Sequence, residues 1–182
     1  MSLVEQVLDF WYAGDVTNRR KEWFKKDPLF DDEIRTRFGA DVEKAAAGEH
    51  DELLETPEGA LALLILLDQF PRNLYRDNAK TFAADPKALE IAKRAIEKGH
   101  DQALTPVQKI FFYLPFEHSE ALSEQDRAVE LCAALGDEDY LKYAIAHRDV
   151  IDRFGRFPHR NEVLGRESTQ EEVAFLKEFG GF

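Results

Sequence analysis

The chain has 182 residues, of which 44% are hydrophobic and 33% charged, a composition that folds around an apolar core and a length typical of one domain. Its 36 acidic residues outnumber the 24 basic ones and give a net charge of −12, which disfavours attraction to nucleic acid or to an anionic membrane. The single cysteine, Cys132, excludes a disulfide framework within the chain and any multi-cysteine metal site.

The start of the sequence and its apolar runs favour a soluble, cytoplasmic protein. No basic residues precede an apolar run at the beginning of the chain, as they would in a signal peptide. The longest apolar run, residues 59–67, is much shorter than the ~20 residues that a membrane span needs. We therefore expect neither a membrane nor a nucleic-acid partner.

Helix-capping residues, helix-starting prolines and terminal glycines recur along the chain, whereas strand-like alternation is hard to find. Ser2 and Glu5 form a capping box ahead of a first helix that ends near Gly14. Further helices are predicted over residues 17–24, 28–38, 41–47, 57–70, 85–98, 106–114, 137–154 and 168–179. Gly39 is expected to end one of them, and Pro115 either kinks the helix before it or begins a new one that runs to residue 135.

The predicted helix over residues 57–70 stands out because it is apolar around its whole circumference. Thr56 and Pro57 provide its start, and Pro71 is expected to end it. Such a helix belongs in the centre of a domain, surrounded by the others. Most aromatic residues, including Trp11, Trp23, Phe24 and the phenylalanines of each helix, are expected in the core. The sequence thus predicts an all-α protein with one domain, residues 1–182, of about eight to ten helices.

Charge is distributed unevenly along the chain. Residues 41–58 hold seven acidic side chains against one basic, and residues 117–139 hold eight against one. Residues 148–166, in contrast, hold five arginines against three acidic residues. These arginines could capture a phosphate or carboxylate. They could equally pair along a helix, Asp149 with Arg153 and Asp152 with Arg156, because each pair is four residues apart.

Three short segments place polar residues where the helical pattern requires apolar ones: residues 68–73, 115–120 and 147–161. Asp68 would be buried and needs a partner, for which Arg72 and Arg76 are the nearest candidates. His147 shares a helical face with Val150 and faces inward. If the three segments meet, they form one polar pocket with the candidate residues Asp68, Arg72, Asn73, Glu117, His118, Glu120, His147, Asp149, Arg153, Arg156, His159, Arg160 and Asn161.

Such a pocket has three interpretations. It could be a hydrogen-bonded network that fixes the helices, an anion-binding pocket, or a catalytic or metal site made from carboxylates and histidines. Neither a zinc-hydrolase motif nor a glycine-rich phosphate loop is present. We therefore predict no metal and no cofactor. Cys132 lies among apolar neighbours and is expected to be a packed core residue, not a nucleophile.

Several strings in the chain carry a family likeness: LLDQFPRN at residues 66–73, LPFEHSE at residues 114–120 and HRDVIDRFGRFPHRN at residues 147–161. With these strings, the sequence resembles a bacterial family catalogued as a domain of unknown function, and the likeness covers nearly the whole chain. The resemblance implies a tetratricopeptide-like fold, a stack of antiparallel helical hairpins. It implies no established activity.

Two functions follow as hypotheses. In the first, the protein is a non-enzymatic binding module whose helices form a groove for a protein or peptide partner. In the second, it is a small-molecule enzyme or anion-binding protein that uses the polar pocket. There, Arg72, Arg153, Arg156 and Arg160 would hold a small anionic ligand, and Glu117, His118 and His147 would handle protons. We favour the binding module.

Overall fold

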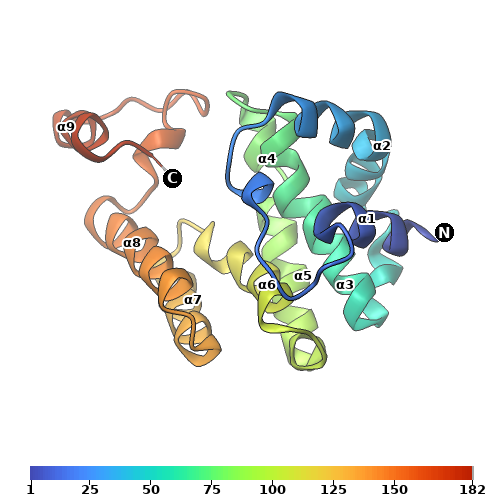
Figure 1. The fold of residues 1–182 in the computed structure, drawn as a ribbon. Coiled ribbons are helices and arrows are strands. Elements are labelled where there is room, and N and C mark those ends of the chain that lie inside the picture. Colours follow the sequence, from blue (N-terminus) through green and yellow to red (C-terminus); the bar gives the residue numbers. More distant parts are fainter. Residues whose placement is uncertain (182) are drawn as a thin grey trace. The chain divides into compact units, whose positions relative to one another are not determined.

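The computed structural model describes residues 1–181, and within that range it contains helices and no strand, which confirms the all-α class (Figure 1). The chain divides into two compact units, the first made of residues 1–76 and 80–115 and the second of residues 77–79 and 116 onward. The single domain and the tetratricopeptide-like stacking stay predictions. None of the described helices combines the length and the apolar character that crossing a membrane requires.

The first unit contains helices that begin where the capping signals predict. They are α1 (Leu3–Tyr12), α2 (Pro28–Ala47), α3 (Pro57–Leu64), α5 (Asp85–Glu97) and α6 (Pro106–Glu117), whose last two residues belong to the second unit. A further helix, α4 (Phe70–Leu74), has no such signal at its start. Ser2 and Glu5 form the predicted capping box of α1. The Thr56 hydroxyl accepts the Gly59 N–H at the start of α3. Side-chain oxygens thus satisfy backbone N–H groups that have no partner within the helix.

The central helix is confirmed, but its predicted end is wrong. Every residue of α3 from Gly59 to Leu64 is buried, as are the five that follow. The helix then continues through a π-helical turn, Ile65–Gln69, into α4. Pro71 lies in the first turn of α4, directly after the π-helical turn, and because proline has no N–H one hydrogen bond of the continuous helix is not made. Tertiary burial on all sides therefore carries the chain past a residue that usually stops a helix.

A second boundary also differs from the prediction. Gly39 does not end a helix, because α2 runs without interruption from Pro28 to Ala47. A glycine costs about 0.5–1 kcal/mol inside a helix. Ile34, Phe38 and Val42 are buried on the same face around it, and burying such side chains contributes about 1.5–3 kcal/mol each. The apolar face therefore outweighs the weak residue.

Aromatic rings fill much of the core of the first unit. The Trp11 and Trp23 rings stack with centroids 5.7 Å apart, and Phe38 stacks on Phe70 at 5.1 Å. The Trp23 indole N–H donates to the Trp11 carbonyl at 2.8 Å. The predicted helix over residues 17–24 is reduced to a short 3-10 turn, Lys21–Trp23, and Phe24 is 61% exposed rather than in the core.

The second unit is built on α7 (Leu122–Leu135) and α8 (Glu138–Phe154), which lie side by side as a helical hairpin, followed by α9 (Gln170–Phe179) (Figure 1). The alternative in which a new helix runs from Pro115 to residue 135 is wrong, because α6 passes through Pro115 and ends at Glu117. The buried Gln125 amide donates to the carbonyls of Glu117 and Ser119, each at 2.6 Å. This side chain satisfies carbonyls that the break in the helix leaves without partners.

Candidate functional site

In the first unit, Asp68 and Arg72 form the ion pair that the sequence predicts. Asp68 is only 1% exposed, and its Oδ1 lies 3.3 Å from Arg72 Nη1. The Arg72 guanidinium also binds both oxygens of Asp85, at 2.9 and 3.0 Å. Burial acts to lower the pKa of Arg72, but the two carboxylates outweigh it and raise the pKa above its ordinary value. One partly buried guanidinium thus holds two carboxylates.

Asn73 belongs to a neighbouring set of polar contacts. Its amide donates to Asp31 at 2.8 Å, and Arg76 Nε binds the other oxygen of Asp31 at 2.7 Å. Arg76 therefore pairs with Asp31 and not with Asp68, as one of the predicted alternatives had it. Burial acts to raise the pKa of Asp31, but hydrogen bonds from Arg76 and Asn73 bring it below its ordinary value. The sequence carried a signal for Asp31, since it lies on the same helical face as Ile34 and Phe38.

In the second unit, Glu117 and His147 meet in a buried contact. Glu117 Oε1 lies 3.1 Å from His147 Nδ1, and both side chains are largely withdrawn from water. The same ring nitrogen donates to the Tyr143 carbonyl at 2.9 Å, one helical turn back along α8. Burial lowers the pKa of His147 to about 3, against a smaller opposing effect of the Tyr143 hydrogen bond. The imidazole is therefore neutral at pH 7.

Polar and ionisable side chains gather around the Phe157 ring, and we call this group the Phe157 cluster. Its members are Glu117, His118, His147, His159 and Arg160. The Arg160 guanidinium lies 4.5 Å from the Phe157 ring centroid and donates to the His118 carbonyl at 3.0 Å. The His159 ring lies 5.5 Å from Phe157.

Glu120, Arg156 and Asn161 form a second group together with Arg166 and Glu172. We call these five residues the arginine network. Arg166 binds both oxygens of Glu120, at 2.8 and 2.9 Å, and Arg156 binds both oxygens of Glu172, at 2.7 and 2.9 Å. Asn161 donates to Glu172 at 3.3 Å and accepts from Arg166 at 2.9 Å. The arginine network thus links the segment between α8 and α9 to Glu120 and Glu172.

Glu172 belongs to this network but is not among the candidate residues that the sequence predicts. It does accept the Thr169 N–H in a capping box. It is also 2% exposed, and the hydrogen bond from Arg156 is the largest of the effects that lower its pKa to about 2. Its partner Arg156 could not be found from sequence, because 16 residues separate the two.

The last two candidate residues, Asp149 and Arg153, lie on the exposed side of α8. The predicted pairing of Asp149 with Arg153 and of Asp152 with Arg156 is wrong. Arg153 binds Glu171 at 2.7 Å, and both aspartates lie nearest to Arg148, at 3.6 and 3.7 Å. Glu171 and Glu172 of α9 bind these arginines instead.

The structure therefore places the thirteen candidate residues in four groups. Asp68, Arg72 and Asn73 belong to the first unit and the other ten to the second. A pocket that combines residues of both units stays a prediction. Among residues 1–181, no group of three His, Cys, Asp or Glu side chains could hold a metal ion.

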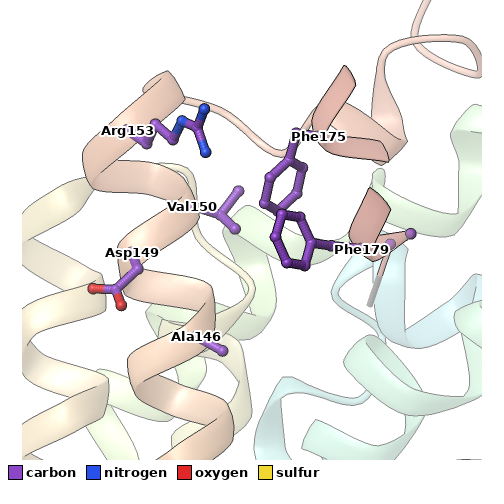
Figure 2. Close-up of a pocket in the computed structure, with 8 residues that line it drawn as sticks. Ala146, Asp149, Val150, Arg153, Phe175 and Phe179 are labelled. Carbon is purple, nitrogen blue, oxygen red and sulfur yellow. The ribbon is translucent and has the colours of Figure 1, made fainter. Parts of the chain in front are cut away.

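A cavity of about 300 Å³ lies between α8 and α9 in the second unit, and we call it the α8–α9 cavity. Residues from both helices and from the turn after α9 line it: Ala146, Asp149, Val150, Arg153, Phe175, Phe179, Gly180 and Gly181. Figure 2 shows the rings of Phe175 and Phe179 one above the other, facing Val150, while the Asp149 carboxylate points away from them. Phe179 is 64% exposed, so the expectation that the phenylalanine of each helix lies in the core is wrong there.

These observations define an all-helical protein with two compact units and a small apolar cavity in the second. The comparisons with known proteins identify its family. Residues 7–180 match the family described as a bacterial protein of unknown function (DUF924), and the chain belongs to that family. The resemblance inferred from the sequence strings is thereby confirmed.

A solved structure is similar over almost the full length of the chain. It is described as the structure of a protein of unknown function, ATU0120, from Agrobacterium tumefaciens. The two chains are 46% identical, 97% of each is covered, and the TM-score is 0.91. No curated protein matches the chain.

Proposed function

We propose that the protein is a non-enzymatic binding module that takes an apolar side chain of a protein or peptide partner into the α8–α9 cavity. The observation that supports this proposal is the cavity itself, whose walls include Val150, Phe175 and Phe179. Its volume of about 300 Å³ is at the lower limit for ligand pockets. It suits one anchoring side chain better than a large cofactor.

The surface beside the cavity also favours a partner. On α9, Phe179, which lines the cavity, is 64% exposed. Covering apolar surface contributes roughly 25 cal/mol per Å², and aromatic side chains are enriched at the centres of interfaces. The cavity wall carries one side chain of each charge, Asp149 and Arg153, which lie near Arg148 and Glu171 respectively. A partner with an apolar anchor fits that arrangement.

The ion pairs that the arginines make argue against the capture of an anion. Arg72 is engaged by Asp68 and Asp85, while Arg153 and Arg156 bind the glutamates of α9. An incoming phosphate would have to displace these carboxylates. The ion pairs therefore favour a structural role for these three arginines over the anion-binding alternative.

The enzyme or anion-binding alternative retains one supporting observation in the Phe157 cluster. A neutral His147 beside Glu117 is a pair that can exchange a proton, and Arg160 adds a positive charge next to it. Thermal melting with phosphate, simple carboxylates, nucleotides and divalent metals tests this alternative. A ligand at 100 times its dissociation constant stabilises by about 2.7 kcal/mol, and the absence of any shift would reject it.

Two variants, each with phenylalanine in place of an alanine, test the binding module. Ala146 lines the α8–α9 cavity, so Ala146→Phe fills it, whereas Ala134 lies exposed on α7 and serves as the matched control Ala134→Phe. Peptides selected from a random library on the wild-type protein are then measured by fluorescence polarisation. We expect Ala146→Phe to weaken binding at least tenfold and Ala134→Phe to leave it unchanged. Equal binding by both variants would show that no side chain of the peptide enters the cavity.

A further inference from the structure

The segment between α1 and α2 differs in charge from the rest of the chain. Residues 19–26 hold five basic side chains against the single carboxylate of Glu22, whereas the whole chain carries a net charge of −12. Figure 1 shows this segment within the blue stretch that joins α1 to α2. We call residues 19–29, which continue into the first turn of α2, the basic loop. It concentrates positive charge at one place on an acidic protein.

The basic loop is attached to the core of the first unit through two side chains. The Trp23 indole is 6% exposed and stacks on Trp11, whose carbonyl accepts its N–H. The Arg20 guanidinium donates to the carbonyls of Phe10 and Trp11 at 2.7 and 2.9 Å. Both carbonyls belong to the last turn of α1, where acceptors have no partner within the helix. A loop that is ordered in this way loses little conformational entropy when it binds.

The outer side of the basic loop carries large apolar side chains. Phe24 is 61% and Leu29 81% exposed, and in the sequence they flank Lys25 and Lys26. The Phe24 ring lies edge-on to the buried Trp23, with the ring centroids 6.3 Å apart. Apolar side chains that are grouped on a surface and bordered by polar residues are typical of interaction sites.

The lysines of the basic loop are not neutralised, although the protein has an excess of acidic residues. Lys21, Lys25 and Lys26 are exposed, and within residues 1–181 no carboxylate contacts the ammonium group of any of the three. Other lysines of the first unit form ion pairs: Lys80 with Glu43, Lys87 with Asp51 and Lys98 with Glu55. The charge of the basic loop is therefore available to an anionic partner.

We propose that the basic loop is a docking site for an extended acidic segment of a partner protein. An apolar residue of that segment packs on Phe24, and its carboxylates face the three lysines. Charge complementarity identifies this occupant, because surfaces of opposite charge attract and orient partners. The site is separate from the α8–α9 cavity, which lies in the other unit. It is therefore independent of the proposed function.

An anionic membrane and a second copy of the chain match the basic loop less well than a peptide. Asp32 and Glu33 follow Leu29 within about one helical turn, and more than half of each side chain is exposed. A flat membrane would bring its headgroups towards these carboxylates as well. A second copy would carry its own net charge of −12. A narrow peptide contacts the basic loop without approaching the other carboxylates of the protein.

The test uses the full chain and two fluorescently labelled acidic peptides, which differ only in a central phenylalanine or serine. Binding is measured by fluorescence polarisation. One variant combines Lys25→Glu with Lys26→Glu. The matched control combines Lys142→Glu with Lys177→Glu, which changes the net charge equally at exposed positions of the second unit. A third variant, Phe24→Ser, removes the apolar contact, and urea unfolding verifies that each variant is folded.

Two results are expected. Lys25→Glu with Lys26→Glu weakens binding of the phenylalanine peptide about tenfold, whereas the control changes it less than twofold, because salt screens distant charges. The wild type binds the phenylalanine peptide about fivefold more tightly than the serine peptide, as expected for one aromatic pair. Phe24→Ser removes this preference. General attraction between opposite charges would not depend on Phe24.

The inference is overturned if neither peptide binds the wild type, or if the loop variant and the charge control bind equally. A preference for phenylalanine that survives Phe24→Ser also overturns it. Two further measurements identify a different occupant. In the absence of peptide binding, sedimentation with phosphatidylserine vesicles that Lys25→Glu with Lys26→Glu abolishes would assign the basic loop to a membrane. A dimer that the same variant dissociates would assign it to a second copy.

Discussion

Replacing Glu172 by glutamine tests how strongly a single carboxylate anchors α9. Glutamine keeps the size of the side chain but removes the charge that Arg156 contacts through two hydrogen bonds at 2.7 and 2.9 Å. The amide can still accept the Thr169 N–H through its oxygen. The substitution therefore isolates the ion pair from the packing and from most of the helix cap.

The magnitude follows from two independent considerations. Lowering the pKa of Glu172 from its ordinary 4.5 to about 2 corresponds to about 3 kcal/mol in favour of the ionised form, since each pKa unit is worth ~1.4 kcal/mol. Removing one partner of a fully buried ion pair costs about 3–5 kcal/mol. The Arg156 side chain is 29% exposed, so water compensates part of the loss. We expect about 2 kcal/mol.

Hydrogen exchange of the amides in α9 is the suitable assay, because Trp11 and Trp23 both lie in the first unit and their fluorescence reports on that unit. A loss of 2 kcal/mol in docking speeds exchange by roughly 30-fold. The control Glu171→Gln removes an exposed ion pair worth about 0–1 kcal/mol and speeds exchange at most fivefold. If Glu172→Gln exchanges no faster than Glu171→Gln, the argument that charge holds α9 fails.

The same comparison has a defined pH dependence. The pKa of Glu172 is lower in the folded protein than in the unfolded chain, so its contribution is fully present above about pH 4.5. It declines as the pH falls from there towards 2, where the carboxylate takes up a proton in the folded state. The ratio of exchange rates between Glu172→Gln and the wild type, taken at equal pH, should therefore shrink between pH 5 and pH 3. A constant ratio would show that Glu172 acts without its charge.

Further predictions concern residues of the two cores. Gly59→Ala should lower the midpoint of urea unfolding, because a Cβ at this position collides with the Leu53 carbonyl. Gly39→Ala, in the middle of α2, brings its Cβ near no other atom and should stabilise the protein by about 0.5–1 kcal/mol. Equal effects of the two substitutions on stability would contradict the helix geometry. Burial raises the pKa of the Cys132 thiol to about 12, so a disulfide reagent at pH 8 should react only after denaturant is added, and rapid reaction with the native protein would contradict its burial.

Local signals predicted the starts of the helices well, and the reason is that caps act within one turn. Ser2 with Glu5 starts α1, and Thr56 with Pro57 starts α3. Both were legible because the hydroxyl and the backbone N–H that it accepts are three residues apart. The family strings predicted the family correctly.

Helix ends and long-range partners could not be predicted in the same way. The chain passes Gly39 and Pro71 because burial of neighbouring apolar residues outweighs local preference. Arg153 and Arg156 bind glutamates of α9, 18 and 16 residues away, in preference to aspartates one turn away. The local pairs at i and i+4 are worth only about 0.2–0.5 kcal/mol, so the tertiary structure decides such choices.

The π-helical turn at Ile65–Gln69 has a geometric consequence for the polar residues after it. A regular helix turns by about 100° for each residue, and a π turn accommodates one extra residue within the same helix. All later side chains are therefore rotated about the helix axis by about 100° relative to their positions in a regular helix. That offset lets Arg72 point at Asp85 while Asn73 points at Asp31. Deleting one residue from the turn would rotate both side chains away from their carboxylates without breaking the helix.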